Sequence, residues 1–474
     1  MDSHYLSGNH STDVQTLNKH LRTGESFDVI GRSLVIGGRQ AVLYFIDGLA
    51  KDEVMEKILE YFLSIQPEEM DARPDAVSFS RFFVPYIEVA QERELDKILT
   101  SILSGTLALL IEGYGDAILI DARTYPTRGV EEPDDDRALR GSRDGFVETL
   151  VHNTALVRRR IRDPQLTMEI LQVGSRSKTD IVLCYMAQLV DKSYLEKIRG
   201  QIQNITIPTL TMSQESLAEC LVKRQWYNPF PRVRYTERPD AAAANLAEGK
   251  IVVIVDNSPS VMILPTSFFD FTQDTNDFYF PPFVGSYLRI VRTVIFLLTL
   301  FLTPVWYLLI QNPAYIPGWL EFIRIEDPIT LPVIFQLLVI EFVIDGLKLA
   351  SLNTPSVLSN SFSVVGALIL GEFAVSAKWF VPEVVLYMAF VAIANFAQPS
   401  FELGYAFKLS RVMLLILTAL FSLWGFVAGL VLLAVLIAST KTIGGKSYLF
   451  PLIPFNKSAF VSLFIRKPIN RNNS

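Results

Sequence analysis

The sequence predicts an α/β N-terminal region of two subdomains followed by an all-α polytopic transmembrane domain of four to five spans. Three observations predict this fold class. Half of the 474 residues are hydrophobic, which is too apolar for a wholly soluble chain of this length. Runs typical of strands and amphipathic helices alternate in the first 284 residues, whereas long apolar runs dominate the rest. Residues 285–474 hold 13 of the 43 Lys and Arg but only 8 of the 49 Asp and Glu, so a mildly basic part follows an acidic one.

Charge and cysteine content exclude several classes of protein. The acidic first part argues against a nucleic-acid partner, because phosphate binding needs a basic face. Cys184 and Cys220 have no CxxC spacing and are expected to be reduced and packed. Residues 1–28 are polar and lack the apolar run of a signal peptide, which predicts that the first large domain stays in the cytoplasm.

Composition divides the chain into five regions. Residues 1–26 are rich in Ser, Asn, Asp and His and are expected to form a disordered tail. We expect the first α/β subdomain over residues 27–145 and the second over 146–284. The helical membrane domain is expected over 285–440, and a cytoplasmic or interfacial tail over 441–474.

Strand and helix signals follow a similar order in the two subdomains. β-rich runs bounded by turn residues predict strands, and apolar residues at helical spacing predict helices. The similar order suggests an ancient duplication, although no residue-level repeat is visible. The expected strands are Ala41–Ile46, Thr106–Ile111, Ala117–Ile120, Asp180–Met186, Ile251–Val255 and Ser260–Leu264, and the expected helices are Lys51–Phe62, Ser193–Arg199 and Glu215–Val222.

Five apolar segments are candidates for membrane spans, since a spanning helix needs about 20 residues. Arg289 and Arg292 precede the first and place the α/β region on the cytoplasmic side. Five crossings would leave the basic C-terminal tail outside, against the positive-inside rule. Three alternatives remain open: a re-entrant segment, a fold-back near Trp424–Gly425, or an exception to the rule. The segments are Thr293–Ile310, Leu331–Ala350, Pro355–Ala377, Val381–Ala397 and Val412–Ser439.

Two further stretches mix charged and apolar residues. Phe401–Leu409 contains Glu402 and Lys408, and Tyr448–Ile465 contains Lys457. This composition is typical of helices that lie in the membrane interface. Both stretches are therefore expected along the membrane surface.

Charged residues inside the second apolar segment predict an ion path. Glu341, Asp345 and Lys348 lie at i, i+4 and i+7, so they share one helix face. A charge at membrane depth costs roughly 2.5–3.5 kcal/mol and therefore needs a partner, a cavity or an ion. Lys348 can neutralise one carboxylate; the other must be protonated, pair across a subunit interface or meet a cation. The alternative is that these side chains lie near the cytoplasmic end of the segment and reach water.

The third apolar segment carries a stripe of small and polar residues on one side. Such a stripe can line a pore, with hydroxyls and an amide facing water. It can equally allow close helix packing, because small residues let backbones approach. The candidate pore or ion-path residues in this stripe are Ser356, Ser359, Asn360, Ser363 and Gly366.

Two charged blocks flank the middle of the α/β region. An acidic run begins at Glu131 and Glu132, and a basic cluster follows later in the chain. They are either solvated surface charges or charges that pair within or between subunits and hold a ring together. The basic candidates for such a subunit interface are Arg158, Arg159, Arg160 and Arg162.

No motif predicts catalysis, a cofactor or a metal site. Gly113-Tyr-Gly115 lacks the third glycine of a dinucleotide fingerprint. Gly445-Lys446-Ser447 resembles the end of a P-loop, but Thr440 occupies the position of its first glycine. His and Cys are not clustered as zinc ligands. The sequence therefore predicts a protein that is not an enzyme and that has no cofactor.

Several motifs resemble those of the A-subunit family of bacterial spore germinant receptors, the GerA family. The resemblance covers nearly everything after Phe27. Ser142 and Asp144 are mild departures from the family pattern. The motifs are Tyr125-Pro-Thr-Arg128-Gly-Val-Glu131-Glu132-Pro133, Arg140-Gly-Ser-Arg143-Asp-Gly145-Phe146, Asn153 with Leu156-Val-Arg158-Arg159-Arg160-Ile-Arg162, Asn228-Pro-Phe-Pro231, Thr236-Glu-Arg-Pro-Asp240, Ile254-Val-Asp256-Asn-Ser-Pro259, Leu352-Asn-Thr-Pro355 and Pro399-Ser-Phe-Glu-Leu403.

The resemblance implies a multi-pass protein of the spore inner membrane with a cytoplasmic N-terminal domain. It also implies a homo-oligomer, a pentamer by resemblance, that works with membrane lipid and other spore germination membrane proteins. Ion release during germination is the expected role. Three hypotheses remain: a subunit that forms or contributes to a cation channel, a scaffold or sensor that assembles a germination complex without conducting, and a secondary transporter. The five segments show no inverted repeat of the kind many transporters have.

Overall fold

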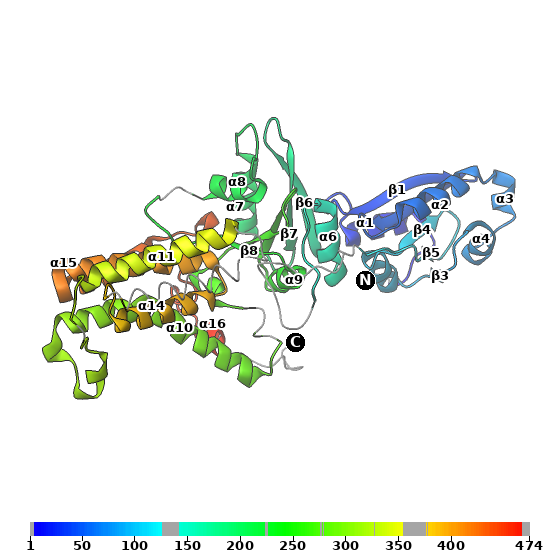
Figure 1. The fold of residues 1–474 in the computed structure, drawn as a ribbon. Helices are drawn as coiled ribbons and strands as arrows, with labels where there is room; N and C mark the ends of the chain where they lie inside the picture. The colour runs from blue at the N-terminus through cyan, green and yellow to red at the C-terminus, as the bar shows by residue number, and fades with distance from the viewer. Residues whose placement is uncertain are drawn as a thin grey trace. The chain divides into compact units, whose positions relative to one another are not determined.

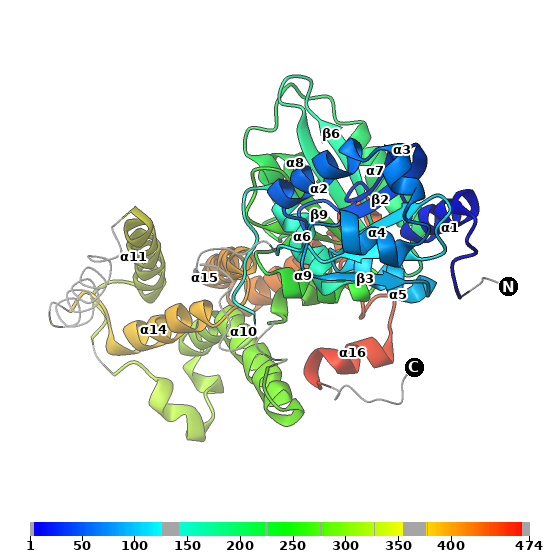
Figure 2. The same cartoon turned by 90° about the vertical axis from the view of Figure 1, so that its right-hand side faces the viewer.

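A computed structural model describes residues 4–125, 142–222, 226–274, 277, 279–326, 328–353, 376 and 378–466. The chain forms two compact units. The first, here called the α/β unit, contains Met1–Arg224 and Val233–Thr266. The second, here called the helical unit, contains Gln225–Arg232 and Ser267–Ser474. Figures 1 and 2 show both units from two directions (Figure 1; Figure 2).

The α/β unit begins with a five-stranded antiparallel sheet. Its strand order is β1-β2-β4-β5-β3. Alternate residues of β2 enter different cores: Leu43 packs with the helices α2 to α4, whereas Val42 and Tyr44 pack with α1 and α5. The sheet is therefore covered on both faces. The elements are α1 (His10–Leu21), β1 (Val29–Ile36), β2 (Arg39–Ile46), α2 (Asp52–Ser64), α3 (Pro67–Asp71), α4 (Ala76–Phe83), β3 (Val89–Glu92), α5 (Leu95–Leu103), β4 (Leu107–Ile111) and β5 (Ala117–Ile120).

A second sheet repeats the topology of the first. Its order is β6-β7-β9-β10-β8, which is the first order with every strand number raised by five. All of its pairings are antiparallel as well. This repeated order is what a duplicated subdomain requires. The elements are α6 (Leu150–Arg160), β6 (Leu166–Val173), β7 (Thr179–Met186), α7 (Lys192–Gln203), α8 (Ser213–Leu221), β8 (Arg234–Thr236), α9 (Pro239–Ala247), β9 (Ile251–Val255) and β10 (Val261–Leu264).

The expectation of a disordered tail over residues 1–26 was wrong. Helix α1 is capped by Asn9, whose side chain accepts a hydrogen bond from the Thr12 amide, and it buries Leu17 and Leu21 against the first sheet. Val14, Leu17 and Leu21 lie at i, i+3 and i+7, a spacing that indicates an amphipathic helix, but the polar composition of the segment outweighed it in the prediction.

The two cysteines are free thiols, and they differ in burial. Cys184 is buried in the core of the second sheet, where burial raises the pKa of its thiol. Cys220 is exposed, so the expectation that both are packed was wrong for this residue. Its position on the outer face of the short helix α8 accounts for the difference.

The helical unit contains five α-helices among its described residues. Helices α10 and α15 are long and apolar enough to cross a membrane. Helix α11 does not meet the same criterion because it contains three charged residues, and α14 does not because it is shorter. The predicted third segment, apart from Ser376, is not among the described residues. Figure 1 shows α10, α11, α14 and α15 running alongside one another. The helices are α10 (Pro282–Gln311), α11 (Val333–Asn353), α14 (Pro382–Phe396), α15 (Phe401–Ser439) and α16 (Lys457–Phe464).

Helix α15 reverses direction at Ser422, where φ is 51° and ψ is −130°. A Cβ placed on Gly429 would lie 2.7 Å from Cδ2 of Leu414, and one on Gly425 would lie 1.9 Å from the carbonyl oxygen of Leu417. In a straight helix, residues 15 apart are separated by roughly 22 Å along the axis. These contacts therefore require two antiparallel halves, and they confirm the predicted alternative of a fold-back in this segment.

The two halves of α15 are aligned with α10. Asn312 follows the end of α10 and donates a hydrogen bond of 3.2 Å to the Ser422 hydroxyl at the reversal. At the middle of α10, the rings of Phe296 and Phe407 are 4.1 Å apart, and Phe407 shares a core with Ile437 of the returning half. Residues 401–409 are thus the first turns of α15 and not a helix separate from it; Leu403 and Phe407 are buried there, whereas Phe401 is exposed.

Replacing Gly425 by alanine is expected to destabilise the helical unit by about 1–3 kcal/mol, the usual cost of overpacking. The added methyl group would meet the backbone of the opposite half of α15, which cannot move aside as a side chain can. Thermal unfolding of the full chain in detergent measures the effect. Gly346 is the matched control because a Cβ there meets nothing within 4 Å, and alanine at that position is expected to be neutral or stabilising. Equal effects at the two glycines would contradict the reversal.

The expected boundary between the α/β region and the helical domain at residue 284 also differs from the structure. Residues 226–232 and 267–281 belong to the helical unit. Asn228 donates a hydrogen bond of 2.6 Å to the Thr440 hydroxyl, and Tyr448 donates one of 2.8 Å to the Pro231 carbonyl. Composition did not reveal this arrangement, because the short segment is polar and proline-rich like a loop.

Candidate functional site

A cluster of charged side chains joins α11 to the first half of α15. Arg411 donates through Nε to Oε1 of Glu341 at 2.7 Å, and through Nη1 to the carbonyl oxygen of Thr299 on α10 at 2.8 Å. Lys408 places Nζ 3.5 Å from Oε2 of Glu341 and also forms an ion pair with Asp345. The Lys408 ammonium further donates to the backbone carbonyl of Glu341 at 3.2 Å. We call these four charged residues, without Thr299, the α11–α15 charge cluster.

Helical spacing on both partners builds this cluster. Glu341 and Asp345 are four residues apart on α11, and Lys408 and Arg411 are three apart on α15, so each pair projects from one helix face. The faces meet because the apolar surfaces beside them pack around Leu337 and Leu415 in one core. Opposite charges therefore face each other across the helix interface.

Burial differs within the cluster. Glu341 is 4% exposed and Arg411 2%, so their ion pair is almost completely removed from solvent within one subunit. The side chain of Asp345 is 38% exposed, so it reaches the surface of the helical unit. A buried charge requires a paired partner, and Glu341 has both Arg411 and Lys408.

The structure corrects one expectation about this segment. Glu341 does not border an open path within the described chain, because two cations from α15 enclose its carboxylate. Lys348 of the same helix lies near these charges, with its ammonium 5.4 Å from the ring centroid of Tyr405. Lys408 and Arg411 were not among the predicted site residues. Their spacing of three places two cations on one face of an apolar helix, and this signal marks a charged face without showing which partner it meets.

The remaining predicted pore residues lie outside the described residues. They are Ser356, Ser359, Asn360, Ser363 and Gly366. The acidic interface candidates Glu131 and Glu132 also lie outside them. The proposal that these groups line a path or hold subunits together stays a prediction.

The basic cluster near the end of α6 is divided among different environments. Arg158 is fully buried and bonds Asp28 through Nε at 2.7 Å and Nη2 at 3.1 Å, so the expectation that it lies at a subunit interface was wrong. Arg160 bonds the carboxylate of Asp144 at 2.6 Å, and Arg159 lies over the ring of Tyr125. Arg162 is exposed. The sequence could not show which of the four arginines is buried, because they are close together in the chain and differ only in the side of the helix from which they project.

The Asp28–Arg158 pair links the two halves of the α/β unit. Asp28 precedes β1, whereas Nη2 of Arg158 also donates to the carbonyl of Leu166 in β6 at 3.0 Å. Ser26 completes the network: its hydroxyl donates to Asp28 at 2.6 Å and accepts from the amide of Met168 at 3.0 Å. The network therefore fixes the start of one sheet against the edge of the other.

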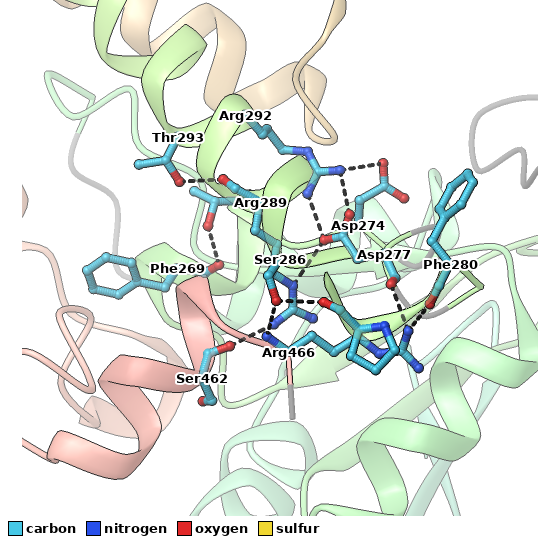
Figure 3. A network of polar contacts seen from close by, with 12 residues as sticks. Phe269, Asp274, Asp277, Phe280, Ser286, Arg289, Arg292, Thr293, Ser462 and Arg466 are labelled. Atoms are coloured by element: carbon cyan, nitrogen blue, oxygen red, sulfur yellow. Dashed lines mark hydrogen bonds and ion pairs between the residues drawn. The ribbon is translucent and has the colours of Figure 1, made fainter. Parts of the chain in front are cut away.

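A second buried network lies at the start of α10. Asp277 is fully buried and accepts from Arg292 through both carboxylate oxygens at 2.9 Å, and from Nε of Arg289 at 3.2 Å. Arg292 also contacts Asp274, and Arg466 donates to the carbonyl of Phe280. Figure 3 shows the three arginines converging around this turn of chain. We call Asp274, Asp277, Arg289, Arg292 and Arg466 the α10 arginine network.

Comparisons with known proteins identify relatives along nearly the whole chain. A family model described as Bacillus/Clostridium GerA spore germination protein matches residues 15–474. Stage V sporulation protein AF of Bacillus subtilis (strain 168) is 39% identical over 445 residues, which cover 94% of this chain and 89% of that protein. Spore germination protein KA of the same organism is 29% identical over 452 residues, 94% of this chain and 82% of that protein.

Among solved structures, an N-terminal domain of a germinant receptor subunit is similar to this chain. It is the crystal structure of the N-terminal domain of the A subunit of the Bacillus megaterium spore germinant receptor GerK3, which aligns with 56% of this chain and 97% of its own at 25% identity and a TM-score of 0.43. Residues 372–375 and 380–384 resemble stretches of stage V sporulation protein AF, and the comparison over 445 residues confirms the likeness to that protein. The chain belongs to the GerA family of spore germination proteins.

Proposed function

We propose that this chain is a non-enzymatic, multi-pass subunit of the spore inner membrane that assembles with copies of itself and contributes to an ion path during germination. Family membership supports the role in germination. The α/β unit is cytoplasmic in this proposal, because Arg289 and Arg292 mark the start of α10. Other germination proteins and membrane lipid are its expected partners.

The distribution of charge and apolar surface in the helical unit supports a location in the membrane. The charges of Glu341, Lys408 and Arg411 are buried between helices. Large apolar side chains, including Phe342 and Leu420, are exposed instead, at 79% and 67%. A soluble protein has the opposite arrangement, whereas lipid tails favour an apolar exterior around polar contacts.

The single observation that carries the ion-path proposal is the partly exposed carboxylate of Asp345. It lies on the surface of a helix whose neighbouring face is formed by exposed Val339, Phe342 and Leu349. An ionised carboxylate facing lipid is costly, so the Asp345 face is expected to meet water or another subunit. A ring of such carboxylates around an oligomer axis would favour cations.

Replacing Asp345 by asparagine tests the proposal, because it removes the charge and keeps the shape. Cation flux through liposomes containing the purified protein, and cation efflux from germinating spores, are expected to fall about tenfold, the effect of ~1.4 kcal/mol in a barrier. Glu321→Gln is the matched control, since Glu321 is an exposed carboxylate in the loop after α10. Flux that is unchanged by Asp345→Asn in an intact oligomer would refute the ion path.

A scaffold that does not conduct is the second candidate function. The observation that favours it is the enclosure of Glu341 by Lys408 and Arg411, which leaves that carboxylate closed to a passing cation. This alternative predicts an assembled protein that gives no flux in liposomes. It also predicts that Asp345→Asn spores germinate normally as long as assembly is retained.

A further inference from the structure

The helical unit contains an apolar cavity of about 420 Å³ between α10, both halves of α15 and α16. This volume falls in the range of ligand pockets in proteins. Most of its lining is aliphatic or aromatic, and the aromatic part comes from six phenylalanines. They are Phe268, Phe269, Phe296, Phe301, Phe407 and Phe464.

Three polar side chains line the cavity as well, and they are Thr272, Arg292 and Thr293. Arg292 belongs to the α10 arginine network (Figure 3). Three guanidinium groups and two carboxylates make up this network, so it carries one formal positive charge in excess. The sequence around this network is also basic, because residues 403–474 contain eight Lys and Arg and no Asp or Glu.

The cavity also opens at the apolar surface of the unit. Leu297 and Ala434 line it and are exposed. Large apolar side chains next to them, such as Val294 and Val435, are exposed too. A molecule that enters from this side therefore comes from an apolar environment.

We propose that this cavity binds one acyl chain of an anionic phospholipid, whose headgroup lies toward Arg292 and its arginine network. The apolar lining matches a hydrocarbon chain, because dry apolar cavities bind apolar molecules and exclude water. The excess positive charge matches a phosphate headgroup, as in other basic pockets between membrane helices. Helix α16, which begins at Lys457, contributes Leu463 and Phe464 to the lining. This inference rests on the proposed membrane location but not on ion conduction.

Two pairs of neighbouring residues provide matched variants. Ala434 and Leu297 line the cavity, whereas Val435 and Leu298 beside them do not. Tryptophan at Ala434 or Leu297 is expected to fill the cavity mouth, and tryptophan at Val435 or Leu298 adds the same bulk elsewhere on the same helix. The second pair keeps the test decisive if one variant fails to fold.

The experiment uses the full chain in detergent and counts bound lipid by native mass spectrometry after incubation with phosphatidylglycerol, phosphatidylcholine or palmitate. We expect the wild type to retain phosphatidylglycerol about tenfold better than phosphatidylcholine, and Ala434→Trp and Leu297→Trp to lose that retention about tenfold. Val435→Trp and Leu298→Trp should match the wild type. Equal retention of the two phospholipids, retention of palmitate alone, or full phosphatidylglycerol retention in the cavity variants would overturn the proposal.

Discussion

Replacing Glu341 by leucine is expected to destabilise the helical unit by about 3–5 kcal/mol, the usual effect of removing one partner of a buried ion pair. Arg411 would lose its carboxylate partner while remaining buried beside α10, and Lys408 would keep Asp345 as an ion-pair partner. Thermal unfolding of the full chain in detergent, followed by tryptophan fluorescence, measures the change. The probe is suitable because all five tryptophans belong to the helical unit.

A double variant separates loss of charge pairing from loss of packing. Glu341→Leu combined with Arg411→Leu removes both members of the buried pair and is expected to recover a large part of the stability, because apolar replacements of a buried pair are often neutral. Glu321→Leu, at an exposed carboxylate, should change stability by less than about 1 kcal/mol. A single variant as stable as this control would show that the Glu341 pair is not buried as described.

The second large effect is expected for Arg158→Leu in the α/β unit. Asp28, itself 1% exposed, would lose its cationic partner, and the carbonyl of Leu166 would lose a donor. We expect a loss of about 3–5 kcal/mol. Hydrogen–deuterium exchange of β1 and β6 is the appropriate measurement, since the α/β unit contains no tryptophan.

The next residue along the chain supplies the control for this variant. Arg159→Leu removes the same charge and adds the same side chain, but Arg159 lies over the ring of Tyr125 and is only partly buried. Its effect is expected to stay below about 1 kcal/mol. Equal protection of β1 and β6 in the two variants would refute the role of Arg158 in joining the two sheets.

Much of the α/β fold followed from the sequence where one physical signal dominated. The runs that became β4, β5 and β9 are short, apolar and bounded by turn residues, so their burial and their limits were both evident. Strand β1 was missed because Gly31-Arg32-Ser33 interrupts its apolar alternation. Its eight-residue pairing with β2 is a tertiary effect that a local pattern does not contain.

The candidate site could be predicted only in part for the same reason. The charges of Glu341 and Asp345 inside an apolar run were evident, and so was their shared face. Their partners lie about 70 residues further along the chain, and no spacing rule connects residues so far apart. The fold-back of α15 at Ser422 brings the helix containing both partners into the bundle, and periodicity alone leaves such a reversal as one alternative among several.

That fold-back also bears on sidedness in the proposed membrane location. A helical hairpin returns the chain to the leaflet from which it entered, so the proposal puts Phe401 and Ser439 on one face of the membrane. The contacts of Phe296 with Phe407, and of Asn312 with Ser422, align this end of the hairpin with the N-terminal half of α10. The proposal then puts Lys441, Lys446 and Lys457 on the same side as Arg289 and Arg292, in agreement with the positive-inside rule.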